Sequence, residues 1–131
     1  MKRYVGAMAA LWAIPVAAAD MLAVPSGQPV ELVETLADAD GPMGLTWRYR
    51  FLTPEIARDA GTVSAEAAFA DMESLCNAVA VPQAAASPQP PDQVVITMMD
   101  RFVAHGDSAP DATQYFDGYR IEGDKCVWEG F

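Results

Sequence analysis

Arginine side chains are the groups in this sequence best suited to chemistry, and that chemistry is the binding of anions. Arg48 and Arg50 stand two residues apart in the apolar–polar alternation of residues 45–52, LTWRYRFL. Residues two apart on a β-strand share a face at about 7 Å, and the forked guanidinium group matches a carboxylate. We predict an interaction patch of Arg48 and Arg50 with Arg101 or Arg120 on a neighbouring strand. The alternative is a solvated face that pairs with nearby acids.

Two cysteines, Cys76 and Cys126, carry all the thiol chemistry of the chain. An even pair in an exported protein is expected to form a disulfide. A redox site would use a C-x-x-C pair or a further resolving thiol, and the sequence has neither. We therefore predict a structural Cys76–Cys126 disulfide. A metal pair or two reactive thiols are the alternatives.

Other residue types give no catalytic or metal-binding pattern. His105 is the single histidine, so neither a histidine-based triad nor a multi-histidine metal site is predicted. Asp71 and Glu73 are close in sequence, but residues two apart on a helix point in different directions. The sequence therefore predicts no catalytic residue, no cofactor and no metal. An enzyme built on carboxylates would have to assemble them across the fold.

One amphipathic helix is expected at Ser64–Val81. Its apolar residues recur at helical spacing, and they are Phe69, Met72, Cys76 and Val79, widened by Leu75. Ser64 is the predicted N-cap, and Pro82 is predicted to end the helix because the residue before a proline is pushed out of helical geometry. The proline-rich residues 82–91 should form an exposed, polyproline-like connection.

The remaining regular structure is predicted to be β-strand. Strands are expected at 30–34, 45–52 and 93–103, with a turn at 38–42 and a C-terminal hairpin over 116–131. A two-residue turn at Gly123–Asp124 sets Ile121 opposite Cys126 and Tyr119 opposite Trp128, all on the core face. The predicted fold is α+β: a small antiparallel sheet of about four to five strands, one main helix packed on one face, and a single disulfide.

The N-terminus is typical of a signal peptide. Residues 1–19 have a basic start, an apolar stretch too short to span a membrane and an alanine-rich cleavage site, so cleavage is expected after Ala19. A flexible arm at 20–29 and one α+β domain at 30–131 should follow. Cleavage would remove Lys2 and Arg3 and lower the net charge from −10 to −12. We expect a periplasmic protein without stable membrane insertion, and its acidity disfavours nucleic acid as a partner.

Four segments together resemble a known family: PEIARD, DMESLC, VVITMMDRFVAHG and ATQYFDGYRIEGDKCVWEGF. They are similar to an uncharacterised domain-of-unknown-function family of small exported alphaproteobacterial proteins, over roughly residues 25–131. The resemblance implies export and no assigned activity. Some relatives carry an acetolactate synthase label, but the chain is too short for a thiamine-diphosphate enzyme and lacks a phosphate-binding glycine loop.

Together these features favour a non-enzymatic periplasmic binding or interaction module. Its partner would be another envelope protein or an anionic small ligand. A small carboxylate-based enzyme and an envelope structural or stress protein without a ligand are the alternatives.

Overall fold

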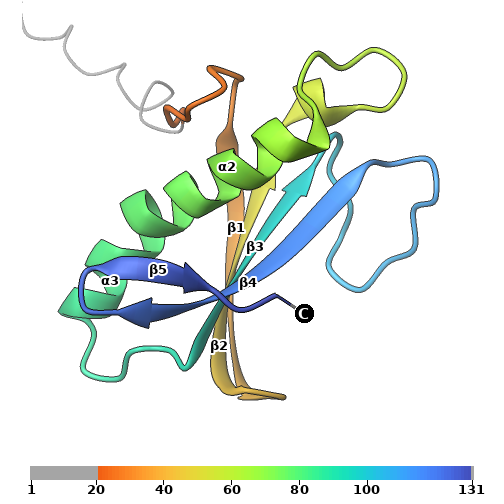
Figure 1. The fold of residues 1–131 in the computed structure, drawn as a ribbon. Coiled ribbons are helices and arrows are strands. Elements are labelled where there is room, and N and C mark those ends of the chain that lie inside the picture. The colour runs from red at the N-terminus through yellow and green to blue at the C-terminus, as the bar shows by residue number, and fades with distance from the viewer. Residues whose placement is uncertain (1–20, 131) are drawn as a thin grey trace, which may run out of the picture.

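Five strands form one sheet in the order β1-β2-β3-β4-β5 in the computed structural model, which describes residues 21–130 (Figure 1). The strands are β1 (Glu31–Gly41), β2 (Gly44–Leu52), β3 (Gln93–Met99), β4 (Gln114–Glu122) and β5 (Lys125–Trp128). Neighbouring strands are antiparallel except β2 and β3, which are parallel. The predicted α+β fold is confirmed, but the sheet is mixed and not antiparallel throughout.

A helical crossover explains the parallel pair. Parallel neighbours need a connection of a dozen or more residues that returns the chain to the same end of the sheet. Here the crossover contains the 3₁₀ turn η2 (Pro54–Ile56), α2 (Ala65–Leu75), the π-helical segment η3 (Cys76–Ala80) and α3 (Val81–Ala86). Every residue of β3 is buried, as expected for a central strand covered on both faces.

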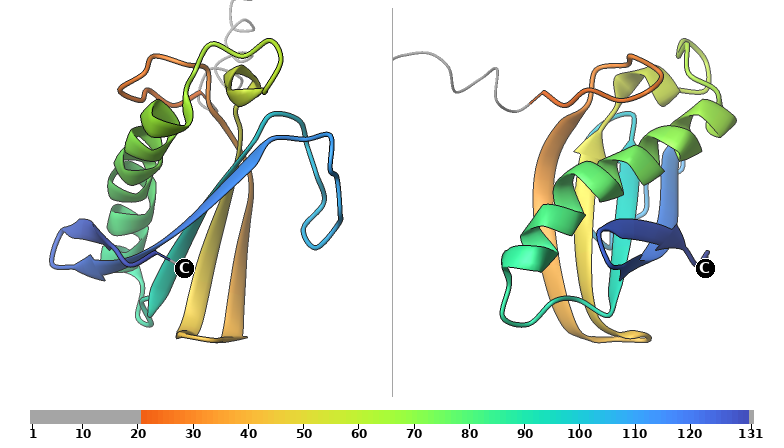
Figure 2. Two further views of the ribbon diagram at one scale, coloured as in Figure 1. Left: turned by 45° about the vertical axis from the view of Figure 1, so that its right-hand side comes forward. Right: turned by 60° about the vertical axis from the view of Figure 1, so that its left-hand side comes forward.

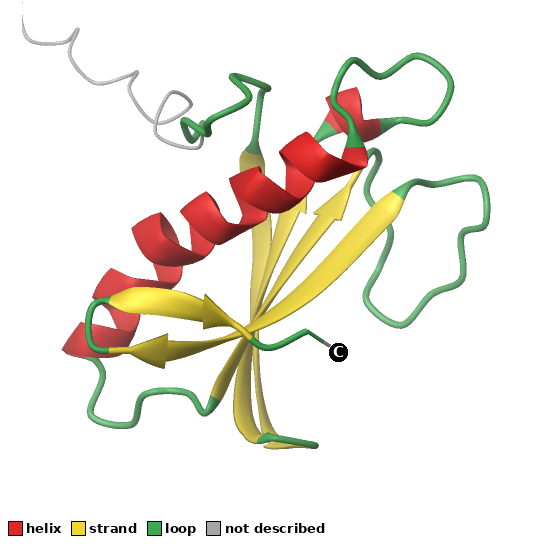
Figure 3. Cartoon of the chain, viewed as in Figure 1, coloured by secondary structure: helices red, strands yellow, loops and turns green. Residues whose placement is uncertain are grey.

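The helix is capped as predicted but does not end at Pro82. Ser64 Oγ accepts a hydrogen bond from Ala67 N at 3.1 Å. In η3 the turn widens, with Val81 N bonded to Cys76 O, and Pro82 falls in the first turn of α3. A proline is tolerated there because its missing N–H is not needed. The predicted polyproline-like connection is therefore wrong over 82–86, and the helical segments form an almost continuous rod (Figure 3).

Two groups of apolar residues pack on opposite faces of the sheet. The helix side holds the larger core, in which Tyr49, Phe51 and Met72 have no exposed surface. On the other side, Met99 packs with Val103 and Ala112 from the β3–β4 loop. The left view of Figure 2 shows the helix on one side of the sheet and this loop on the other.

Two details of the predicted faces are wrong. Phe69, placed in the apolar stripe, is 44% exposed, while Ala68 and Asp71 of the same helix are buried. The polar face of β2 is not solvated throughout, because Thr46 and Arg50 are buried beneath other parts of the chain. Both errors arise where a distant segment, rather than the local pattern, decides what is covered.

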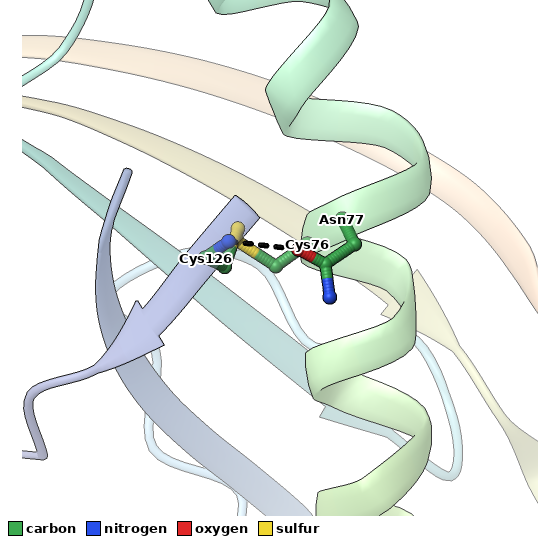
Figure 4. Close-up of a disulfide and its surroundings, with 3 residues drawn as sticks. All are labelled: Cys76, Asn77 and Cys126. Carbon is green, nitrogen blue, oxygen red and sulfur yellow. Dashed lines mark hydrogen bonds between the residues drawn. A yellow bond between two sulfur atoms is a disulfide. The ribbon is translucent and has the colours of Figure 1, made fainter. Parts of the chain in front are cut away.

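The disulfide and the register of the C-terminal hairpin are as predicted, but Trp128, which was expected on the core face, is 63% exposed. Ile121 pairs with Cys126 and Tyr119 with Trp128, so that Cys126 faces the helix. Cys126 is bonded to Cys76 with the two Cα atoms 6.2 Å apart. Asn77 Oδ1 accepts a hydrogen bond from Cys126 N at 2.7 Å beside this bond (Figure 4). The β4–β5 hairpin is thus joined to η3 by two neighbouring contacts.

The described part of the predicted arm, residues 21–29, packs against the domain. Asp71 has no exposed surface and accepts hydrogen bonds from Ser26 N at 2.9 Å, Ser26 Oγ at 2.5 Å and Gln28 Nε2 at 2.8 Å. Leu22 and Val24 contact the larger core. The arm therefore supplies the partners that allow a carboxylate to be buried in α2.

Strand β1 is longer than predicted. It continues through the expected turn at 38–42 as far as Gly41. The chain then reverses at Pro42 and Met43, so that Gly41 pairs with Gly44. The predicted signal peptide and Asp20 lie outside the described residues. Among residues 21–130, no helix is long and apolar enough to cross a membrane.

Candidate functional site

Arg50 is an internal anchor rather than part of a binding surface. Its guanidinium group forms an ion pair with Glu34 and donates a hydrogen bond to the carbonyl of Val103. The ring of Phe102 lies 5.7 Å from the same group. With 3% of its surface exposed, Arg50 fastens the β3–β4 loop to the sheet and has no room for a ligand.

Arg101 lies in that same loop and is separate from the other predicted arginines. Its side chain is 60% exposed and sits 3.5 Å from Asp100. It also donates a hydrogen bond to the carbonyl of Asp111 at 3.3 Å. Its contacts are therefore local to the loop, and Arg101 does not join Arg48 and Arg50 in the predicted patch.

Arg48 and Arg120 do come together, at a groove of about 630 Å³ that we call the arginine groove. Its other lining residues are Pro42, Met43, Gln93, Trp128, Glu129 and Gly130. Arg48 pairs with Val95 across β2 and β3, and Val95 pairs in turn with Gly118. Val95 and Gly118 are both buried, and the backbone of the C-terminal residues lies against this row, because Gly118 O accepts hydrogen bonds from Glu129 N and Gly130 N.

The two arginines of the groove differ in their charge compensation. Arg120 Nε lies 2.8 Å from Glu122 Oε2, and its terminal nitrogen lies 3.7 Å from Glu129. The hydrogen bond and the charge of Glu122 raise the pKa of Arg120. Within residues 21–130, Arg48 makes no ion pair and no side-chain hydrogen bond. Among the residues that the structure describes, Arg48 is thus the cation of the groove that has no ionic partner.

Trp128 forms the wall at the C-terminal end of the arginine groove. Its indole Nε1 donates a hydrogen bond to Asp117 Oδ1 at 2.6 Å. Glu129 N and Gly130 N both donate to Gly118 O, at 2.8 and 3.3 Å. Gly130 has a φ of +75°, and a Cβ there would lie 3.0 Å from the indole ring. A side chain at residue 130 would therefore disturb the wall.

A second groove, of about 480 Å³, shares Trp128 and Gly130 with the arginine groove, and we call it the aromatic groove. It is lined by Phe69, Ala70, Glu73, Phe116, Asp117, Tyr119, Trp128 and Gly130. Sequence reasoning missed this surface. The sequence signal for this surface was the spacing of Phe116 and Trp128, because the predicted hairpin brings both residues to one edge of the sheet. Phe69, which the helix prediction placed in the core, lines the same groove.

The residues considered for catalysis lie apart. Asp71 is buried under the N-terminal arm, whereas Glu73 is exposed in the aromatic groove. His105 is exposed in the β3–β4 loop. No group of three or more histidine, cysteine or acidic residues suited to a metal occurs in the described part of the chain. What the arrangement offers chemically is binding by one guanidinium group and by a set of aromatic rings.

Comparison with known proteins gives a family but no activity. No curated protein and no solved structure matches the chain. A family model matches residues 7–131, and its description is a family of unknown function, DUF6497. The expected membership in an uncharacterised domain-of-unknown-function family is confirmed at this level. The chain belongs to DUF6497, a family of unknown function.

Proposed function

We propose that this protein is a non-enzymatic periplasmic binding module that holds a carboxylate in the arginine groove. The observation that carries the proposal is Arg48, a half-buried cation that lines an open groove and has no ionic partner within residues 21–130. A guanidinium group binds a carboxylate through two parallel hydrogen bonds. The buried residue Gln93 lines the same groove and adds an amide donor.

The C-terminus of a partner polypeptide fits this groove better than a simple anion. Glu129 Oε1 is buried and has no hydrogen-bond partner within the described residues. A buried acceptor without a donor is unfavourable, so a ligand that brings an N–H group would be preferred. A peptide C-terminus offers its carboxylate to Arg48, and its last amide N–H can satisfy Glu129 Oε1 if the Glu129 side chain turns toward the groove. A free small anion offers only the first of these contacts.

The test is an NMR titration of the oxidised protein starting at Asp20. The probe is a tripeptide of three alanines with a free C-terminus, beside the same peptide with an amidated C-terminus. We expect the acid to shift the Arg48 side-chain Nε–H signal and the amide to leave it in place. Arg48→Gln should abolish binding. Arg101→Gln, which removes an exposed arginine outside the groove, is the matched control and should bind as wild type.

Equal binding of the acid and the amide, or equal loss in both variants, would exclude Arg48 as the carboxylate anchor. Export is tested separately by expressing the full chain and sequencing the N-terminus of the protein recovered from the periplasmic fraction. The expected first residue is Asp20. Recovery of the intact chain in the cytoplasmic fraction would exclude the periplasmic part of the proposal without affecting the groove.

A further inference from the structure

Exposed aromatic side chains gather at the aromatic groove. Phe69, Phe116 and Trp128 are 44%, 51% and 63% exposed, and all three line it. They come from α2, β4 and β5, so the fold brings the main helix to both strands of the C-terminal hairpin. Exposed aromatic clusters mark interaction sites, and rigid aromatic rings are enriched among the residues that dominate binding energy.

The same groove is negatively charged. Glu73 and Asp117 line it, and none of its lining residues between 21 and 130 is basic. Neither carboxylate forms an ion pair within residues 21–130. Burial raises the pKa of Tyr119, and the charges of Asp117 and Glu73 raise it further, as expected if both carboxylates lie near that hydroxyl group.

Aromatic rings and carboxylates together select a cation. The face of an aromatic ring attracts a positive charge, and the alkyl stem of lysine or arginine packs against apolar surface while its charged end reaches a carboxylate. The rings are about half exposed, so a small cation would remain largely in water. A side chain presented by a protein adds contact area around it, and the net charge of −10 attracts basic partners.

We propose that the aromatic groove binds a lysine or arginine side chain from a basic segment of a partner protein. Glu73 and Asp117 hold the charge, while Phe69, Phe116 and Trp128 hold the alkyl stem. The proposal is independent of the arginine groove, because the two surfaces share Trp128 and Gly130 but differ in every charged residue.

The test follows the Trp128 indole N–H signal by NMR in the oxidised protein from Asp20. The probes are capped tripeptides with lysine, arginine or glutamine between two leucines. We expect the two basic peptides to bind at least about fivefold more tightly than the glutamine peptide at low salt, a ratio typical of an exposed cation–π and charge contact. Added salt should reduce the difference.

Matched variants separate charge from fold. Glu73→Gln with Asp117→Asn removes both charges but leaves an acceptor for the Trp128 indole, and it should abolish the preference for basic peptides. Glu31→Gln with Asp38→Asn removes two charges from β1, at the other edge of the sheet, and should leave the preference unchanged. Phe116→Leu keeps apolar bulk without the aromatic face and should weaken basic peptides about threefold. Thermal melts confirm that each variant is folded.

Equal binding of the lysine and glutamine peptides would overturn the proposal, as would a preference that survives the charge-removing variant. A dimer seen by sedimentation that dissociates on Phe116→Leu would also overturn it, because a second copy would then be the occupant. Unchanged binding of the tripeptide acid in Arg48→Gln would count only against the proposed carboxylate site and would leave the proposal for the aromatic groove unaffected.

Discussion

Replacing Asp71 by alanine should detach the N-terminal arm and destabilise the whole domain. The carboxylate accepts three hydrogen bonds, two from Ser26 and one from Gln28. Hydrogen bonds to a charged group contribute about 1.5–3 kcal/mol each. Ser26 and Gln28 both belong to the arm and would form hydrogen bonds with water once the arm moves, which offsets part of this loss. We therefore expect the free energy of unfolding to fall by about 3 kcal/mol rather than by the full sum.

Two measurements check this expectation. In a urea titration followed by far-ultraviolet circular dichroism, a loss of about 3 kcal/mol at an m-value of about 1.5 kcal/mol/M lowers the midpoint by about 2 M. Hydrogen exchange should also accelerate in the arm, where Leu22 N bonds to Val30 O and Gly27 N to Val24 O. Exchange in β3, at the centre of the sheet, should accelerate only by the amount that the lower free energy of global unfolding predicts.

A matched control uses another acid of the same helix. Glu66 is exposed in the first turn of α2, where its charge contributes only about 0.5 kcal/mol through the helix dipole. Glu66→Ala should therefore shift the midpoint little and leave the arm unchanged. A loss below about 1 kcal/mol in Asp71→Ala, or equal effects of the two variants, would refute the role assigned to Asp71.

Three further predictions concern the disulfide, the buried side chain of Tyr49, and the difference between Arg48 and Arg50. Replacing Cys76 and Cys126, 50 residues apart, by serine should lower the free energy of unfolding by about 4 kcal/mol through chain entropy; a urea titration showing less than about 1 kcal/mol would contradict this. Burial raises the pKa of Tyr49 from 10.0 to about 12. The unfolded chain therefore loses this proton first, so the contribution of Tyr49 to stability should be constant below pH 10 and fall by up to about 1.4 kcal/mol per pH unit up to about pH 12. Tyr49→Phe should remove that part of the fall in alkaline unfolding curves, and an unchanged curve would refute it. Arg50→Gln should destabilise by about 2 kcal/mol because it leaves buried groups unpaired, whereas Arg48→Gln should change stability by less than about 0.5 kcal/mol; equal thermal shifts would contradict the distinction.

Local patterns predicted the parts of the fold that local physics determines. The alternation in residues 45–52 identified β2 and the residues that face the core, because side chains of a strand point alternately to its two faces. The Gly123–Asp124 turn set the register that aims Cys126 at the helix. The serine in front of the apolar periodicity, Ser64, is the N-cap as predicted, and α2 begins at the next residue.

The other features of the fold depend on contacts between residues far apart in the sequence, and a local sequence pattern does not predict such contacts. The widened turn at η3 lets the helix pass Pro82, which a rule about neighbouring residues does not anticipate. Arg50 is buried because a loop about fifty residues later in the chain folds over it. Asp71 is buried because the N-terminal arm brings Ser26 and Gln28 to it. Of the predicted arginines, Arg48 and Arg120 therefore line one groove, whereas Arg50 and Arg101 form contacts with the β3–β4 loop.

The Cys76–Cys126 bond also determines what a single protease cut would do to the protein. The exposed part of the β3–β4 loop around His105 and Gly106 is the longest stretch without regular structure between the two cysteines, and such loops are preferred cleavage sites. A cut there would divide the chain between β3 and β4, yet both pieces would stay covalently joined through the disulfide. The nicked molecule would keep its mass under oxidising conditions and separate into two fragments only after reduction. Both grooves would retain their lining residues, since none of these lies in the cut loop.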